Sequence, residues 1–297
     1  MGEKSKPVKV VAIGGSGAGV GALGGLGVAA ASILFIINAF TAFLIVSGIW
    51  SIFSIVSSTG LNFSAALPVL GEIVSRVGSA ASSISLMLYL DVVAFAFIGV
   101  ALILVRVKMK EAGISAIIGA IAAFAFAGVA YYVRFTLLPP IMSTLDQVAV
   151  SGLSTTSLIL LGSVVLQAMN FTTIFLVQGI VFFAFGIFMR GVVNNLNRTY
   201  GKMTRGGRLI LTVSIMNLVS MAALYYATSA LRTVLEGVLA SLGGGGSLAL
   251  PDITTLLPTV VAFGLGVFLK LITIPIMAAF AYLSLTFGFY GMAKGPK

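Results

Sequence analysis

Six long apolar segments constrain this chain more than any other feature of its sequence. Each has at least about 20 residues, the length that an α-helix needs to cross the hydrocarbon core of a bilayer. They occupy residues 28–56, 84–105, 114–137, 158–189, 209–230 and 257–292. Because backbone polar groups at membrane depth must be satisfied within their own segment, each is predicted to be a helix. The expected fold is an all-α, polytopic bundle of about six transmembrane helices.

The composition agrees with one membrane-embedded domain over residues 1–297. Apolar residues make up 59% of the chain and charged residues 8%, whereas soluble domains use roughly 45–50% and about 25%. No long polar stretch offers a separate soluble domain. Residues 1–27 form a basic, Gly-rich segment, and the apolar run after it is too long for a secretory signal. We therefore expect the first span to be retained.

The basic residues predict the orientation of the bundle. Most of the 17 Lys and Arg residues lie at the amino terminus, after the second span, after the fourth span and at the carboxy terminus. Since such residues accumulate on the cytoplasmic side, both termini are predicted to be cytoplasmic, in a protein of the cell membrane. The opposite connections are largely apolar, and within them residues 63–77 and 231–242 are expected to form amphipathic helices at the outer face.

The sequence contains neither Cys nor His. These residues are common ligands of zinc, haem and iron–sulfur clusters, and His is a frequent general base near neutral pH. An intramembrane aspartyl protease needs two carboxylates, but Asp91 is the only acidic residue placed inside a predicted span. We therefore expect no catalytic residue, no cofactor and no metal, and we do not expect an enzyme.

A Gly-rich run precedes the first span. Gly17, Gly19 and Ala22 fit the G-x-G-x-x-A pattern of a dinucleotide-binding turn, but no acidic residue follows about 20 positions later and no βαβ alternation appears. Glycines spaced by four residues are instead typical of helix packing, because they let two helical backbones approach closely. The candidate packing residues are Gly15, Gly19, Gly21 and Gly25.

Three charged residues fall within or at the end of predicted spans, namely Asp91, Arg134 and Lys270. A charge at membrane depth is costly and marks function by default. In an antiparallel hairpin of the second and third spans, Asp91 and Arg134 are offset by roughly 9 Å, which a long Arg side chain largely bridges. A structural pair or snorkelling side chains are one interpretation, and a water-filled path is the other.

The fourth span carries three amide side chains, Gln167, Asn170 and Gln178. Asn170 and Gln178 are eight residues apart and so lie near one helical face. Hydrogen bonds between helices explain such residues without further function, and a polar channel lining is the alternative. Convergence of Asp91, Gln178 and Lys270 on one cavity would favour a transporter or channel, whereas scattered packing contacts would not.

The connection after the fourth span is strongly basic. It runs from Arg190 to Leu209, and its basic residues are Arg190, Arg198, Lys202, Arg205 and Arg208. Such a segment attracts anionic lipid headgroups, and it also suits the acidic face of a partner or nucleic-acid phosphate. An apolar span that ends in Arg190, followed by Arg205-Gly-Gly-Arg-Leu-Ile, resembles the polytopic inner-membrane (TrbL-like) subunits of type IV secretion and conjugation systems, including the archaeal DNA-exchange (Ced) membrane subunits.

That resemblance covers residues 182–221 and the general plan of spans. It implies a non-catalytic subunit of a DNA-translocating complex that works with a cytoplasmic ATPase and pilin-like membrane subunits, as one copy or as a homo-oligomer. Arg198, Lys202, Arg205 and Arg208 would then contact the ATPase or DNA. The alternatives are a small-molecule transporter or channel, and a structural subunit of another membrane complex.

Overall fold

The computed structural model describes residues 16–58, 63–151, 155–200, 204–244 and 253–293, and every secondary-structure element in these ranges is helical. Within them, six helices are long and apolar enough to cross a membrane. This confirms the predicted number of spanning helices. The spans are Leu26–Gly48, Val74–Lys108, Lys110–Val148, Gly162–Arg198, Gly206–Val234 and Val261–Tyr290.

Four of the six spanning units are uninterrupted helices, and the other two are interrupted by a π-helical turn. The uninterrupted helices are α1 (Ser16–Ser58), α2 (Phe63–Lys108), α5 (Thr155–Tyr200) and α6 (Thr204–Gly244). The third unit comprises η1 (Lys110–Ala112), α3 (Gly113–Tyr132), the π-helix η2 (Val133–Leu137) and α4 (Leu138–Ser151). The sixth comprises α7 (Ile253–Phe268), the π-helix η3 (Leu269–Thr273) and α8 (Ile274–Ala293).

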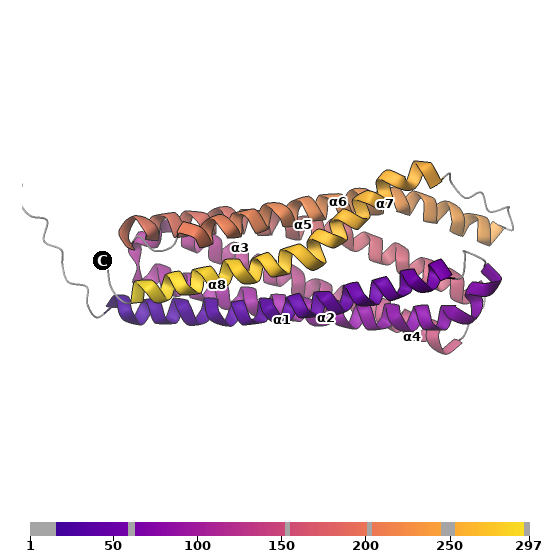
Figure 1. The fold of residues 1–297 in the computed structure, drawn as a ribbon, viewed down its shortest axis with the longest axis horizontal. Helices are drawn as coiled ribbons and strands as arrows, with labels where there is room; N and C mark the ends of the chain where they lie inside the picture. Colours follow the sequence, from indigo (N-terminus) through magenta and orange to yellow (C-terminus); the bar gives the residue numbers. More distant parts are fainter. Residues whose placement is uncertain (1–15, 59–62, 152–154, 201–203, 245–252, 294–297) are drawn as a thin grey trace, which may run out of the picture.

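The helices run together along one long axis (Figure 1). The start of α1, the end of α5, the start of α6 and the end of α8 lie at the left of that view. We call this the basic end because Lys108, Arg198 and Arg208 belong to it. The opposite end, where α6 ends and α7 begins, is the far end. Both termini of the described chain therefore lie at the same end of the bundle.

The two ranges expected to form amphipathic helices at the outer face are helical, but they are not separate elements. Residues 63–77 are the first turns of α2, and residues 231–242 are the last turns of α6. The 46-residue helix α2 is about 69 Å long at 1.5 Å per residue, more than twice the roughly 30 Å of a hydrocarbon core. The basic connection is also largely helical, because α5 continues to Tyr200 and α6 begins at Thr204.

Both π-helical turns have a cause in the sequence. A proline ring clashes with the carbonyl four residues before it and removes one backbone hydrogen bond. Four residues before Pro275 is Leu271, which lies within η3, and four residues before Pro139 is Phe135, which lies within η2. Near Pro275 the helix therefore continues through a π-helical turn.

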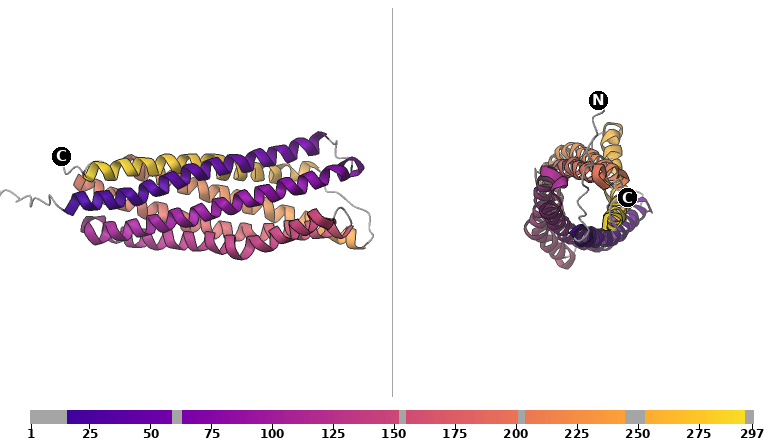
Figure 2. Two further views of the ribbon diagram at one scale, coloured as in Figure 1. Left: turned by 90° about the horizontal axis from the view of Figure 1, so that it is seen from below. Right: turned by 90° about the vertical axis from the view of Figure 1, so that its left-hand side faces the viewer.

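The spanning units form a closed ring around the bundle axis (Figure 2, right). Neighbours around the ring are α1 with α2, α2 with α3, α3 with α5, α5 with α6, α6 with α7 and α8, and α8 with α1. The centre is filled by apolar side chains from all six units, including Phe95, Phe126, Phe185 and Tyr282. Large apolar side chains also cover the outside, for example Ile121 and Phe280, as a lipid-facing surface requires.

Exposed tyrosines mark a second boundary along the helices. In α2, the exposed Tyr89 lies about 29 Å from Lys108, and in α6 the exposed Tyr225 lies about 26 Å from Arg208 at 1.5 Å per residue. Tyrosine side chains collect at membrane interfaces, and these spacings are close to the roughly 30 Å hydrocarbon thickness. Both helices therefore carry an apolar stretch of bilayer length between a basic and a tyrosine boundary.

Glycines bring helices together at places that the sequence analysis did not single out. A β-carbon added to Gly186 in α5 would lie 2.6 Å from Cβ of Ser214 in α6, and one added to Gly27 in α1 would lie 2.9 Å from Cβ of Ala101 in α2. Only a residue without a side chain permits such contact. Of the predicted packing residues, Gly15 lies outside the described residues, and the contacts of Gly19, Gly21 and Gly25 lie outside the described part of the chain.

Candidate functional site

Four polar side chains meet inside the ring, and we call them the polar cluster: Asn38 of α1, Asp91 of α2, Asn217 of α6 and Lys270 of η3. Asn38 Nδ2 donates a hydrogen bond to Asp91 Oδ1 at 2.7 Å. Lys270 Nζ donates a hydrogen bond to Asn217 Oδ1 at 2.9 Å. Four different elements thus contribute to one polar site inside the ring.

Three members of the polar cluster are buried and Lys270 is half-buried, and their hydrogen-bonding groups are only partly satisfied. Asn38, Asp91 and Asn217 are 3%, 6% and 1% exposed. Asn38 Oδ1 and Asn217 Nδ2 have no hydrogen-bond partner among the described residues. A buried polar atom without a partner costs about 1–3 kcal/mol, so the protein maintains this site against a free-energy cost, as functional polar sites in membranes do.

The two halves of the polar cluster carry opposite charges across a small cavity. This cavity has a volume of about 30 Å³ and is lined by all four members of the cluster. It is thus large enough for about one water molecule. Among the described residues the ion pairs are Arg76 with Glu72 and Arg232 with Glu236, so Asp91 and Lys270 interact through space and through their amide partners.

The π-helical turn places Lys270. Its extra residue per turn rotates the side chains that follow, and such turns are frequent at functional sites. Next to it, Ser220 of α6 donates its hydroxyl hydrogen to the backbone carbonyl of Gly266 at 2.8 Å. Polar side chains of neighbouring helices commonly satisfy backbone groups where a membrane helix is irregular. The sequence thus builds the site from Pro275, Lys270 and the facing side of α6.

Among the described residues, Asp91 and Arg134 form no ion pair, so the structural-pair interpretation is not supported. Asp91 is bonded to Asn38 instead. Arg134 lies in η2, where its guanidinium carbon is 5.1 Å from the centre of the Phe135 ring. A cation over an aromatic face is attracted by the ring's negative charge distribution. The two predicted intramembrane cations thus occupy different environments, although both lie in π-helical turns.

A second and larger cavity adjoins the polar cluster. Its volume is about 490 Å³, within the range of small-molecule sites. Asp91, Gln178 and Lys270 all line it, which is the convergence that the sequence analysis proposed as a test. From these residues it extends toward the far end as far as Ile84 of α2 and Leu231 of α6.

Aromatic rings pack on the basic-end side of the polar cluster. The ring of Phe95, one helical turn beyond Asp91, lies 4.1 Å from the Phe126 ring and 5.5 Å from the Phe185 ring. Phe182 lies 5.6 Å from Phe95 and 5.3 Å from Phe126. Phe35 stacks on Tyr282 with ring centres 4.7 Å apart. These six residues form the aromatic plug, which lies next to the cavity on its basic-end side. Further buried apolar residues, such as Leu102, Val105 and Leu196, fill the ring from there to the basic end.

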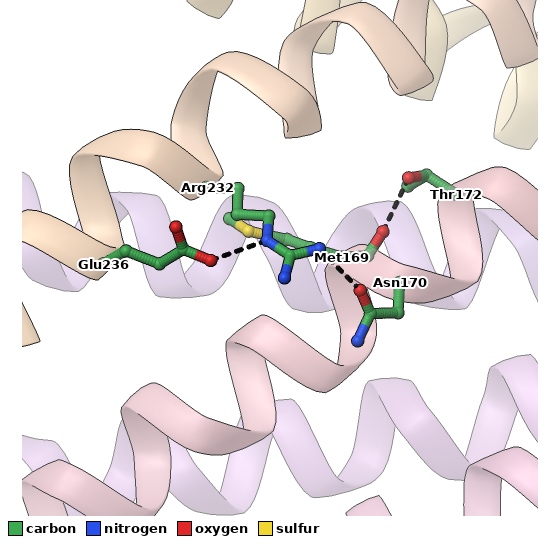
Figure 3. Close-up of polar contacts among 5 residues, drawn as sticks. All are labelled: Met169, Asn170, Thr172, Arg232 and Glu236. Atoms are coloured by element: carbon green, nitrogen blue, oxygen red, sulfur yellow. Dashed lines mark hydrogen bonds and ion pairs between the residues drawn. The ribbon is translucent and has the colours of Figure 1, made fainter.

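The three amides of α5 have different environments. Gln178 is 2% exposed, and its Nε2 has no partner among the described residues. Asn170 is exposed and accepts a hydrogen bond from Arg232 Nη1 at 2.9 Å, while Arg232 Nε lies 2.7 Å from Glu236 Oε1 (Figure 3). Gln167 is exposed. Asn170 therefore joins α5 to α6 near the far end, and only Gln178 faces the cavity.

The basic segment lies at the basic end, away from both cavities. The side chains of Arg190, Arg198 and Arg208 are exposed. Lys202 lies outside the described residues, and Arg205 lies in the first turn of α6, with its side chain outside the described part of the chain.

Asn38 and Asn217 are site residues that sequence reasoning missed. Each is an amide inside a predicted span, which is the same signal that drew attention to Gln178. Screening every span for amides as well as charges would have found both. Their pairing with Asp91 and Lys270 depends on the order of helices around the ring, which the sequence does not state.

Within the described ranges, no group of three or more acidic residues is placed to hold a metal ion. Comparisons of the chain with family models, with curated proteins and with solved structures found no match. The functional argument therefore rests on the geometry of the chain itself.

Proposed function

We propose that this protein forms a gated passage for small solutes across the cell membrane. The convergence of Asp91, Gln178 and Lys270 on one cavity inside the ring carries the proposal. Isolated packing contacts would have scattered these costly side chains over separate interfaces. In this proposal the cavity is the half of the passage that reaches toward the far end, and the aromatic plug is the closed gate.

The polar cluster suits a passage better than a purely structural role. A structural pair gains most from direct contact with every polar atom satisfied, whereas here Asp91 and Lys270 face a shared cavity and two amide atoms lack partners. A solute that passes can exchange hydrogen bonds with these groups, and the opposite charges keep the site neutral. To connect the cavity to the basic end, the Phe95 and Phe182 rings would have to move together with the buried apolar residues beyond them, such as Leu102 and Leu196.

The test is efflux from liposomes that contain the purified protein. Val267 lines the large cavity, whereas Val261 on the same helix is 62% exposed and faces outward. We expect the protein to release a trapped small solute such as radiolabelled glycerol, Val267→Trp to slow the release, and Val261→Trp to leave it unchanged. Efflux at the rate of protein-free liposomes, for both the native protein and Phe95→Ala, would overturn the proposal.

A second candidate function is a non-catalytic subunit of a DNA-translocating, type IV secretion-like complex. It is favoured by the exposed Arg190, Arg198 and Arg208 at one end of the bundle, together with the resemblance of residues 182–221. The 490 Å³ cavity is on the scale of a small molecule, so DNA would pass between copies of the chain or beside partner subunits. A cytoplasmic ATPase would supply the energy, and pilin-like subunits would contact the far half of the helices.

Affinity purification from native membranes separates the two candidates. A tag at the carboxy terminus should retain an ATPase and pilin-like proteins if the second candidate holds, and neutralising Arg198, Lys202, Arg205 and Arg208 to Gln should release the ATPase. Lys108→Gln with Lys110→Gln is the matched control at the same end. Purification of the chain alone, combined with solute efflux, would exclude the second candidate.

A further inference from the structure

The large cavity has an apolar wall and a polar floor. Its wall includes Ile45, Leu88, Phe175, Met221 and Phe263, and its floor consists of Asp91, Gln178 and Lys270. Ligand sites are typically apolar with a few polar groups that fix orientation. The cavity therefore selects ligands by their shape and by the hydrogen bonds that they can form with the polar floor residues.

The floor holds one amide donor that has no partner at all among the described residues. Gln178 is only 2% exposed, and its Nε2 has no hydrogen-bond partner among the described residues. By contrast, Lys270 Nζ gives one of its three hydrogens to Asn217, and Asp91 Oδ1 accepts from Asn38, so these two groups are partly satisfied without a ligand. A ligand oxygen next to Gln178 would remove the cost of the unpaired amide group.

The charges at the floor favour a neutral ligand. Asp91 and Lys270 carry opposite formal charges and line the same cavity, so their fields largely cancel for a molecule between them. An ion in this cavity would lose its hydration and gain mainly contacts with apolar side chains. Inorganic ions and nucleotides are therefore poor ligands for it.

We propose that the cavity binds an uncharged, mostly apolar molecule with a single oxygen acceptor, such as a ketone, ester or alcohol, placed beside Gln178 Nε2. The apolar body extends toward the far end between α2, α5, α6 and α7. The binding itself does not depend on the proposed passage. A bound molecule would obstruct that passage, and only this consequence rests on the proposed function.

The probe is an undecan-2-one derivative that carries a photoactivatable diazirine, used on the full-length protein in lipid nanodiscs. Labelled residues are mapped by mass spectrometry, and unlabelled undecan-2-one and undecane compete. We expect labelling of lining residues such as Met169 and Met221, with undecan-2-one the stronger competitor. Loss of one hydrogen bond corresponds to about a fivefold change in affinity.

Gln178→Met removes the donor and keeps a side chain of similar size. We expect it to abolish the preference for undecan-2-one over undecane, while Gln167→Met, at an exposed position of the same helix, retains it. Val267→Trp narrows the cavity and should weaken labelling. Equal competition by both compounds in the native protein, or labelling confined to the outer surface, would overturn the proposal. Specific labelling without solute efflux would contradict the proposed passage but would still support the binding site.

Discussion

Removing the Lys270 ammonium should destabilise the bundle far more than removing a surface lysine. In Lys270→Met the buried Asp91, 6% exposed, loses the only cation that lines its cavity, and Asn217 Oδ1 loses its donor. A carboxylate left without a counter-charge in a bilayer-depth site has no water to replace it.

The magnitude follows from the two losses. Removing one partner of a buried charge pair costs about 3–5 kcal/mol in soluble proteins. Part of that figure is the unpaired amide, which by itself costs about 1–3 kcal/mol. We therefore expect Lys270→Met to lower the free energy of unfolding by about 3–5 kcal/mol. Adding Asp91→Asn removes the uncompensated charge, and contacting residues couple by about 0.5–3 kcal/mol, so the double variant should recover part of the loss.

The assay is unfolding in mixed micelles, followed by the loss of helical circular dichroism as denaturing detergent increases. Lys108→Met is the control, because this lysine is exposed at the end of α2 and surface changes usually stay within about 0.5 kcal/mol. The reasoning is refuted if Lys270→Met is as mild as Lys108→Met. It is equally refuted if the effects of Lys270→Met and Asp91→Asn simply add.

Three further predictions concern packing and the gate, and the same unfolding assay measures the first and third. Gly186→Ala should cost about 1–3 kcal/mol because its β-carbon would overlap Ser214, whereas Gly128→Ala, with open space around it, should be neutral or stabilising by up to about 1 kcal/mol; equal effects would contradict this packing. Phe95→Ala should speed glycerol efflux from liposomes, since it opens the aromatic plug, and unchanged efflux would place the gate elsewhere. Arg232→Ala should change stability by less than about 1 kcal/mol, because this ion pair is half exposed, and a larger loss would show that the link to Asn170 organises the far end.

The number of spanning helices was predictable because twenty or more apolar residues in succession have no other stable form in a bilayer. Their ends were not. Hydropathy falls where Ser, Gly and Pro accumulate, and residues 63–77 therefore seemed to form a separate element. In the structure they continue α2 without interruption, since a helix that leaves the bilayer still satisfies its own backbone hydrogen bonds.

The candidate site was predictable in its charged members and not in its pairing. Asp91 and Lys270 stand out in any apolar span, and Pro275 indicates an irregular turn beside Lys270. The partner of Asp91 could not be deduced, because adjacency along the chain suggested Arg134 of the next span. The closed ring instead places Asn38 of α1 against it, and ring closure is a property of packing among all six units.

The most direct test of the proposed passage is the reactivity of single introduced cysteines. The sequence contains no Cys, so all labelling comes from the introduced residue. The thiolate is the reactive form of Cys, and it forms readily only in contact with water. The account predicts that Thr228→Cys and Gln178→Cys, both in the cavity lining, react with a small water-soluble thiol reagent in liposomes. Two variants should remain unreacted. Phe185→Cys lies in the aromatic plug, and Ile180→Cys replaces a 54% exposed side chain on the outside of α5. Reaction at Ile180→Cys with none at Thr228→Cys and Gln178→Cys would contradict it.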